Sequence, residues 1–323
     1  MNRDVTSDKW QVTRTASSAG RHVTRHSSPV TRSAFTLVEV LVVMVLLSLI
    51  VLVLMAVFNS AQTAFRTGVT QTDVLEGGRA TMDLMAADVR NMAPSDGYTN
   101  RIENSIFIPG AVNFCAYTDG GAPLVQSLAG SSAQRVNTLE RFFILSRNNV
   151  NGQDIWTGTG YVVDTASASP LYPLYRFSAS TNSSGTDPAL LFNAFLAEVA
   201  SGQWTNMSHL MDGVVNLSVR AYDLNGTLMT TNVLYSGGQF VTNRNVLYFA
   251  PASGEIGFEM FSNTLPATVE IEMGVLEDRT LQRAGSLGAS TNALAGYLAQ
   301  QAGAVHIFRQ RVSIPNFDPS AYQ

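Results

Sequence analysis

The feature that most constrains this chain is an uninterrupted apolar run near its N-terminus, VLVVMVLLSLIVLVLMAVF, at residues 40–58. These nineteen residues include one hydroxyl side chain, Ser48, and no charged side chain. At 1.5 Å per residue, a helix of this length is about 28 Å long, which is close to the hydrocarbon thickness of a bilayer. The run therefore predicts a transmembrane helix over residues 40–58.

The residues before this run are basic, and the rest of the chain is acidic. Residues 1–34 carry six basic and two acidic side chains, so they contribute +4 to a formal net charge of −4 and leave −8 for the remainder. Because Lys and Arg tend to stay in the cytoplasm, the N-terminus is expected inside and everything after Phe58 outside. The low charged fraction, 14%, and the absence of a basic surplus argue against a disordered or nucleic-acid-binding protein.

Three interpretations compete for this N-terminus: a secretory signal peptide, a plain signal anchor, and a more specific signal. A secretory signal peptide has an apolar core of roughly 7 to 15 residues and an A-x-A cleavage site. The run here is longer, and the NSAQTAFR that follows contains no clear site of that kind. A plain anchor leaves Glu39 unexplained, because an ionisable side chain at the mouth of an apolar span is costly unless it has a partner.

The segment around Glu39 reads SAFTLVEV at residues 33–40, and it resembles the class III signal of type IV pilins and type II secretion pseudopilins. The resemblance implies that a prepilin peptidase cuts between Ala34 and Phe35 and methylates the new N-terminus at Phe35. It also implies that Glu39 is the glutamate required for assembly, and that the partners are this peptidase and methyltransferase, other major and minor subunits, and the bacterial inner membrane. The chain departs from the family at Ala34, where Gly is usual, and in its longer leader.

The chemistry of that signal fits these residues. Removal of the leader exposes an α-ammonium at the end of an apolar helix, and a carboxylate four residues further on can neutralise it within one subunit or between two. In a filament core of low dielectric, neither charge is tolerable alone. The resemblance thus implies a single-pass inner-membrane precursor with a cytoplasmic N-terminus and a periplasmic head, which later joins a periplasmic or surface filament.

Beyond the membrane run, residues 59–93 are predicted to continue the helix in an amphipathic form. The small and apolar positions recur at alternating spacings of three and four, and they are Leu75, Gly78, Met82, Met85, Val89 and Met92. We expect this stripe to pack on a sheet, and the helix to end at Ala93–Pro94 because proline cannot continue it. A glycine costs about 1 kcal/mol in a helix interior, so a kink is expected near Gly68 or the pair Gly77–Gly78.

From Pro94 onward the sequence changes to short alternating runs separated by Gly, Asn, Asp and Ser, which indicates antiparallel strands. The clearest strands cover 215–222, 269–275 and 305–314, and Asp223–Gly226 is predicted to form a tight hairpin turn. In the first strand, Val215, Leu217, Val219 and Ala221 are expected on one face, and Asn216, Ser218, Arg220 and Tyr222 on the other. Further strands are predicted at 106–108, 112–117, 139–145, 161–163, 174–177 and 246–250.

Two helices are predicted within this β-rich region. Asp187 is a candidate N-cap, Pro188 suits the first helical position and Gly202 suits a terminator, so one helix is expected over 189–200. A second is expected over 291–301, with loops at 178–186 and 283–292. The predicted fold class is therefore α+β, with a basic leader at 1–34, a long N-terminal helix at 35–93, and an antiparallel β-rich head at 94–323 on which the helix packs.

Three later segments extend the resemblance. They are MDLMAADVR at 82–90, the stretch 213–226 with its Tyr-Asp turn, and LPATVEI at 265–271. This set is similar to J-type minor pseudopilins and PilW-like minor pilins, in which a helix ends in an Asp-x-Arg element. The prepilin-like Verru_Chthon cassette proteins have the same layout, so the subfamily stays open between these groups.

No catalytic constellation is apparent, and no enzyme activity, cofactor or metal site is predicted. Outside the leader, which holds His22 and His26, the histidines His209 and His306 lack metal-ligand spacing, and the single cysteine, Cys115, fits a small buried residue. Asp223 belongs to a fragment of a calcium loop that lacks the later Glu. We expect a structural pilin or pseudopilin subunit; the alternative is a membrane-anchored periplasmic enzyme or binding protein that keeps its leader.

Overall fold

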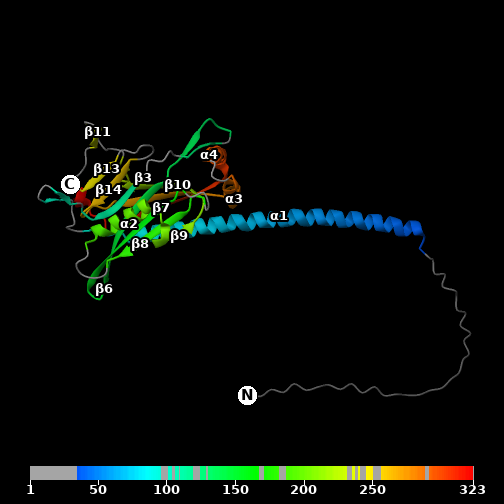
Figure 1. The fold of residues 1–323 in the computed structure, drawn as a ribbon, viewed down its shortest axis with the longest axis horizontal. Coiled ribbons are helices and arrows are strands. Elements are labelled where there is room, and N and C mark those ends of the chain that lie inside the picture. Colours follow the sequence, from blue (N-terminus) through cyan, green and yellow to red (C-terminus); the bar gives the residue numbers. More distant parts are fainter. Residues whose placement is uncertain are drawn as a thin grey trace, which may run out of the picture. The chain divides into compact units, whose positions relative to one another are not determined.

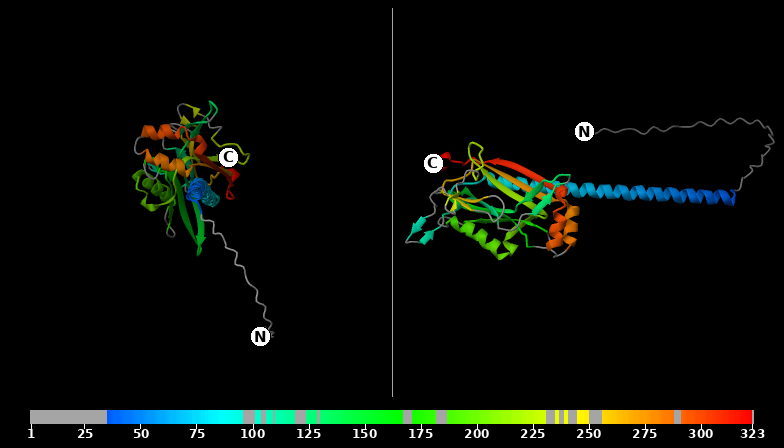
Figure 2. Two further views of the ribbon diagram at one scale, coloured as in Figure 1. Left: turned by 90° about the vertical axis from the view of Figure 1, so that its right-hand side faces the viewer. Right: turned by 90° about the horizontal axis from the view of Figure 1, so that it is seen from above.

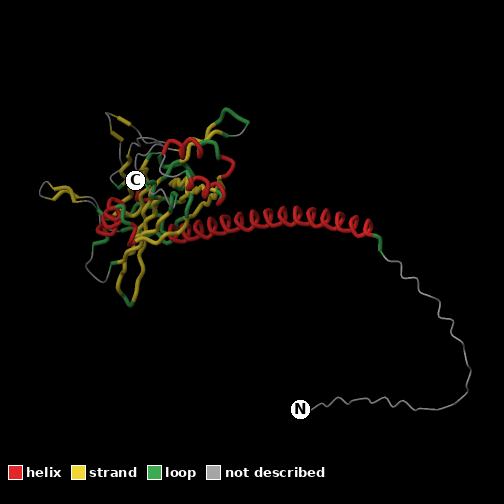
Figure 3. The backbone as a smooth tube through the Cα atoms, turned by 45° about the vertical axis from the view of Figure 1, so that its right-hand side comes forward, coloured by secondary structure: helices red, strands yellow, loops and turns green. Residues whose placement is uncertain are grey.

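The computed structural model describes residues 35–95, 101–103, 106–108, 110–118, 124–128, 130–166, 171–181, 187–230, 235–236, 239–240, 245–249, 256–287 and 291–322. The expected leader, with Ala34, His22 and His26, lies outside the described residues. The chain divides into two compact units, Met1–Ala61 and Gln62–Gln323. Figure 1 labels the elements, and Figure 3 shows helices in red and strands in yellow. A long helix and a β-rich head confirm the predicted α+β class.

The first element is a helix, α1, which runs from Leu37 to Arg90. It continues without interruption through Gly68, Gly77 and Gly78, so the glycines do not end it. The helix stops before the expected Ala93–Pro94 boundary, because the chain then leaves it to pair with a strand. Met92 forms an isolated antiparallel bridge with Ser146, and the Ala93 N–H donates to the Leu145 carbonyl at 2.9 Å.

The stripe on the C-terminal part of α1 is confirmed with one correction. Met82, Met85, Val89 and Met92 are buried, whereas Leu75 is 45% exposed. Val74 packs on the core in its place, because it lies four residues before the buried Gly78. A Cβ atom added at Gly78 would overlap the ring of Phe308. Gly78 therefore permits a close approach of the helix to the strand that carries Phe308.

The larger sheet has seven antiparallel strands in the order β13-β14-β3-β6-β7-β8-β9. In chain order these strands are β3 (Val112–Thr118), β6 (Glu140–Val150), β7 (Gln153–Val163), β8 (Leu174–Ser180), β9 (Met207–Met211), β13 (Val246–Phe249) and β14 (Gly257–Phe261). Five were predicted, although β6 and β7 are longer than expected and β8 covers 178–180 of the expected loop. Ala250 lies outside the described residues.

The smaller sheet has three strands, β10 (Val214–Tyr222), β15 (Thr268–Leu276) and β16 (Val305–Ser313), in that order across the sheet. All three were predicted, and so was the turn after β10. One detail was wrong. The register shifts between Val214 and Asn216, and this bulge turns Val215 away from Leu217, so Val215 packs in a different cluster. Val214 takes the place expected for Val215.

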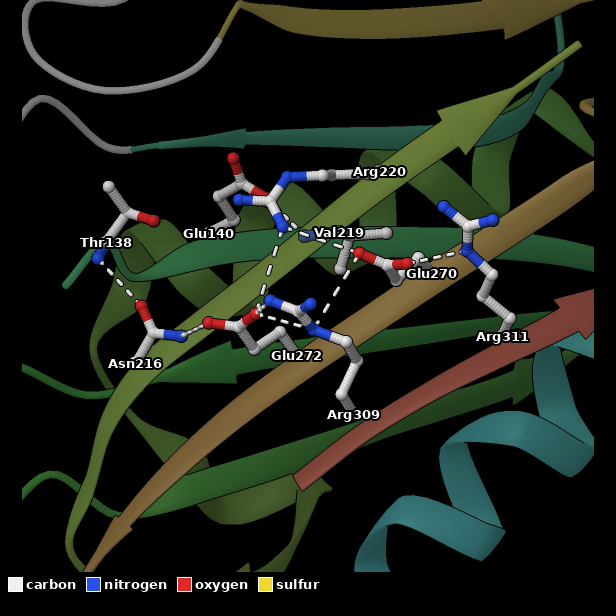
Figure 4. Close-up of polar contacts among 9 residues, drawn as sticks. All are labelled: Thr138, Glu140, Asn216, Val219, Arg220, Glu270, Glu272, Arg309 and Arg311. Atoms are coloured by element: carbon white, nitrogen blue, oxygen red, sulfur yellow. Dashed lines mark hydrogen bonds and ion pairs between the residues drawn. The ribbon is translucent and has the colours of Figure 1, made fainter. Parts of the chain in front are cut away.

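The face of this sheet that carries Arg220 holds a ladder of ion pairs (Figure 4). Glu270 accepts a hydrogen bond from Arg311 Nε at 2.6 Å, and Glu272 accepts one from Arg309 Nε at 2.9 Å. Burial raises the pKa of Glu270, but the guanidinium groups of Arg311, Arg309 and Arg220 outweigh it and lower that pKa below its ordinary value. On the polar face expected for β10, Arg220 and Asn216 thus contact the carboxylates of β15, and these carboxylates also bind the arginines of β16.

The two sheets are joined where β6 begins. Leu139 forms a parallel bridge with Leu217, and Glu140, which is 4% exposed, accepts the Val219 N–H at 2.6 Å. Asn216 Oδ1 accepts the Thr138 N–H at 3.0 Å (Figure 4). These bonds satisfy groups that burial would otherwise leave unpaired, so the end of the larger sheet is fixed to the smaller one.

Three further helices among the described residues cover the head. The helix α2 (Ala189–Ser201) begins where Asp187 Oδ1 accepts the Ala189 N–H and ends at Gly202 in the left-handed conformation, as predicted. The helix α3 (Asp278–Ser286) was missed, and it replaces part of the loop expected at 283–292. The helix α4 (Thr291–Leu298) is shorter than expected, and Figure 2 shows it beside α3 in orange. Thr280 and Ala284, four residues apart, are the buried residues of α3.

The remaining elements are short. The described residues also form three two-stranded ribbons, β1 (Arg101–Glu103) with β2 (Ile106–Ile108), β4 (Leu124–Ser127) with β5 (Gln134–Asn137), and β11 (Tyr235–Ser236) with β12 (Gln239–Phe240). The 3-10 turns are η1 (Trp204–Asn206), η2 (Ala302–Ala304) and η3 (Pro319–Tyr322). Only β2 among these was predicted.

The described residues form three core clusters. The largest joins the stripe of α1 to one face of the seven-stranded sheet and one face of the three-stranded sheet. The second lies on the other face of the larger sheet under α2, where Gly160 leaves room for the ring of Phe195. The third gathers Val215 and Leu276 with α3 and α4. The C-terminal part of α1 is therefore a core element of the head.

Candidate processing and assembly site

The N-terminal end of α1 begins with a reciprocal pair of side chains. Phe35 and Thr36 are outside the helix, and Leu37 is its first residue. Glu39 Oε2 accepts hydrogen bonds from the Thr36 N–H at 2.9 Å and from the Thr36 hydroxyl at 3.0 Å, while the Glu39 N–H donates to Thr36 Oγ1 at 3.3 Å. This is a capping box, in which a Thr and a Glu three residues later satisfy each other's backbone N–H groups.

The capping box places two of the predicted site residues. Phe35 lies just outside the helix with 82% of its surface exposed, and Glu39 lies in the first turn, where a carboxylate interacts favourably with the helix dipole. Ala34, the other side of the expected cleavage point, is outside the described residues. Sequence reasoning missed Thr36, although the T-x-x-E spacing before an apolar run is itself the signal of a capping box.

The apolar side chains that follow the capping box are not covered by the rest of the described chain. One helix there, Leu37–Phe65, is long and apolar enough to cross a membrane, with a mean hydropathy of 3.4 and none of its most apolar window buried. Its hydroxyl at Ser48 donates to the Val45 carbonyl at 2.9 Å, so that polar group is satisfied within the helix, as an apolar surrounding requires. Such a surface needs lipid or other apolar helices to cover it.

The C-terminal end of α1 carries a second carboxylate with distant partners. Asp88 Oδ2 accepts hydrogen bonds from the Tyr161 hydroxyl of β7 and from Arg176 Nε of β8, the latter at 2.8 Å, and Asp88 Oδ1 accepts one from Arg176 Nη2 at 3.1 Å. Burial is the main cause that raises the pKa of Tyr161, and the negative charge of Asp88 is the second. The hydrogen bond to Asp88 raises the pKa of Arg176. Asp88 thus ties the helix to the larger sheet.

The other candidate residues named in the sequence analysis make contacts that stabilise the fold. His209 Nε2 lies 2.7 Å from Asp212 Oδ1, and His306 Nε2 lies 3.5 Å from Glu277 Oε1. Cys115 is buried, and burial raises the pKa of its thiol well above the ordinary value. Asp223 Oδ1 accepts the N–H groups of Asn225 and Thr227 at 2.9 and 2.7 Å, which explains its place in the turn.

No metal-binding cluster is present among the residues that the structure describes, since no group of three or more His, Cys, Asp or Glu side chains is placed to hold an ion. The four side chains above belong to separate elements and do not converge. The arrangement that stands out is therefore the start of α1.

Comparison with known proteins also points to the start of α1 as the functional site. Residues 31–55 match the family model for the prokaryotic N-terminal methylation motif. No curated protein and no solved structure matches the chain. The motif, followed by one apolar helix, supports a pilin-like or pseudopilin-like prepilin that is membrane-anchored and structural in role. It also implies processing by a prepilin peptidase and assembly with other pilins.

Proposed function

We propose that this chain is a minor pilin or pseudopilin subunit of the J-like kind. It is made as a single-pass inner-membrane precursor with its N-terminus in the cytoplasm, cut between Ala34 and Phe35, and methylated at Phe35. Its N-terminal helix then packs into a type IV pilus or a type II secretion pseudopilus. The observation that carries this proposal is the methylation motif at residues 31–55, at the start of a helix whose apolar surface is bare.

Glu39 is the assembly residue in this proposal. Its Oε2 atom accepts both bonds from Thr36, and within the described residues Oε1 accepts none. Cleavage before Phe35 would place a new α-ammonium one residue from Thr36, so the carboxylate and the ammonium lie at the same end of one helix. Inside a bundle of apolar helices, each charge stabilises the other, because an unpaired buried charge is strongly destabilising.

The head supports a structural role through its packing. We propose that the head extends over 94–323, the helix over 35–93 and the leader over 1–34. Each segment that resembles the J-like kind contains a residue that stabilises the fold. Asp88 bonds the helix to the larger sheet, Asp223 forms the turn after β10, and Leu265 is fully buried in the main cluster. The head would lie on the filament surface and contact other subunits.

The mature N-terminus tests the proposal. Mass spectrometry of the chain purified from its bacterial membrane should find an N-terminal peptide that begins with N-methylated Phe35. A mature chain that still begins at Met1 contradicts the proposal and favours a membrane-anchored enzyme or binding protein.

The residue before the cut provides a matched pair of variants. Ala34→Leu should leave a full-length precursor visible on a gel, because a bulky side chain replaces the small one expected beside the cut. Ala34→Gly should be processed at least as well as the parent. Equal processing of the leucine variant would show that the assigned cleavage point is wrong.

A further inference from the structure

The unit Gln62–Gln323 contains a groove of about 330 Å³ that the proposed function does not use. It lies between α1, the end of β9, β15 and the start of α3. Its apolar lining includes Val74, Met211 and Leu281, and three carboxylates, Asp73, Asp212 and Asp278, also line it. The groove therefore combines apolar surface with several acidic side chains.

Arginine and lysine do not neutralise these carboxylates within the described part of the chain. Asp212 is paired with His209, and Asp278 accepts a hydrogen bond from the Gln282 amide at 2.8 Å. Asp73 is exposed and makes no hydrogen bond or ion pair within the described residues. The complement of such a groove is a cation on an aliphatic stem, because the stem covers apolar surface while the charged head reaches the carboxylates.

We propose that this groove receives an arginine or lysine side chain from a neighbouring, different subunit of the assembly. This inference rests on the proposed function. Asp73 follows Phe65, the last residue of the membrane-crossing stretch, by only eight residues. Subunits whose apolar helices associate therefore bring the residues just beyond the membrane within reach of one another, at about 1.5 Å per helical residue.

The charge of the chain favours a different subunit over a second copy. Once residues 1–34 are removed, the remainder has a formal net charge of −8, so two copies repel each other. A neighbour with a basic side chain on an apolar surface is attracted instead, and charge complementarity of this kind fixes which partner binds and in which register.

Filling the groove tests the inference. A Cβ atom added at Gly77, which lines the groove, meets nothing within 4 Å, and the same holds at Gly296 on α4, outside the groove. Leucine at either position favours the helix relative to glycine, so both variants should fold. We measure the fraction of the full-length, processed chain that is recovered in cross-linked assemblies with other pilin subunits. Gly77→Leu should lower this fraction about tenfold, a loss that one well-packed interface side chain can cause, and Gly296→Leu should leave it unchanged.

A second pair of variants tests the charge of the occupant. Asp73→Asn removes one negative charge with little change in shape, and Asp73→Glu keeps the charge. The assembled fraction should fall several-fold for Asp73→Asn and stay near the parent value for Asp73→Glu, and added salt should weaken assembly of the parent more than that of Asp73→Asn.

The outcomes separate this inference from the proposed function. A parent chain that is not cut before Phe35, or that enters no assembly, overturns the proposed function and this inference with it. If the parent is cut and assembled, and Gly77→Leu has the same melting temperature and the same assembled fraction as the parent, then the proposed groove contact is wrong and the proposed function stands. If Gly77→Leu fails while Asp73→Asn assembles like Asp73→Glu, the occupant is apolar, and the cationic partner is wrong.

Discussion

The two ends of α1 are built for different surroundings. From Leu37 to Phe65 its most apolar window has no side chain buried, whereas near the other end Met85, Val89 and Met92 are fully covered. The sequence marks the difference, because the first part is apolar on every side and the second only along a stripe. A helix that is apolar all round needs partners outside its chain, and a helix with a stripe packs against its own sheet.

The carboxylates at the two ends differ in the same way. Glu39 bonds to Thr36, three residues away, while Asp88 bonds to Tyr161 and Arg176, which are 73 and 88 residues away. A local cap can form in an isolated helix. The second contact can form only when the head has folded, so it reports on tertiary structure.

The largest expected effect is on assembly, at the exposed end. Glu39→Val and Glu39→Gln should both insert in the membrane and be cut, yet fail to enter the filament, because a buried ammonium then lacks its countercharge. The measurement is the amount of each processed variant in purified filaments or pseudopilus complexes.

The glutamine variant sharpens this comparison because its side-chain oxygen can still accept bonds from Thr36. It keeps part of the capping box and removes the charge. Normal assembly of Glu39→Gln, together with failure of Glu39→Val, would reduce Glu39 to a helix cap.

The second prediction contrasts truncations at the two ends. Met85→Ala alone should cost about 2 to 5 kcal/mol of unfolding free energy, and Met85→Ala with Val89→Ala should cost more, a large share of a domain stability of about 5 to 15 kcal/mol. Leu46→Ala with Leu49→Ala, at positions 55% and 57% exposed, should leave the melting of the head unchanged. Thermal unfolding of the full chains in detergent, followed by near-ultraviolet circular dichroism, measures both.

Equal melting of these two double variants would contradict the comparison. The stripe would then face a neighbouring subunit, and its loss would appear only as failed complex formation.

The third prediction concerns the distant contact of Asp88. Asp88→Asn removes the charge that Arg176 and Tyr161 share, and a partly buried group left without its partner costs about 1 to 3 kcal/mol. Asp83→Asn, at an exposed position on the same helix, should change stability by less than about 0.5 kcal/mol. Urea unfolding of both variants provides the comparison, and similar midpoints would show that Asp88 does not hold the helix on the sheet.

Elements with a strong local pattern could be predicted from the sequence. The alternation in β15 and β16, the turn at Asp223 and the cap and terminator of α2 are all properties of neighbouring residues. The start of the membrane-crossing helix belongs to the same class. In each case, a residue's neighbours along the chain determine its conformation.

Features that depend on distant residues could not be predicted in this way. The strand β14 is short and has the sequence GFEMF, so it shows no clear alternation of polar and apolar residues. Its Glu259 is largely buried in the sheet, and this burial raises the pKa of Glu259 to about 7. The bulge at Val215 arises from pairing between β10 and β15, and the partner of Asp88 is Arg176 and not the nearby Arg90 of the Asp-x-Arg element. These contacts depend on the order of strands across the sheets.

The last prediction compares two adjacent glycines on α1. A Cβ atom at Gly78 would overlap the Phe308 ring, whereas one at Gly77 meets nothing within 4 Å. Gly78→Ala should therefore destabilise the head by about 1 to 3 kcal/mol through overpacking, and Gly77→Ala should stabilise it by up to about 1 kcal/mol because alanine favours the helix. The two variants have the same composition and differ by one position, so denaturant midpoints that shift in opposite directions identify which side of α1 lies on β16. Shifts in the same direction would show that Gly78 does not pack against Phe308. The packed part of α1 would then begin only after residue 78.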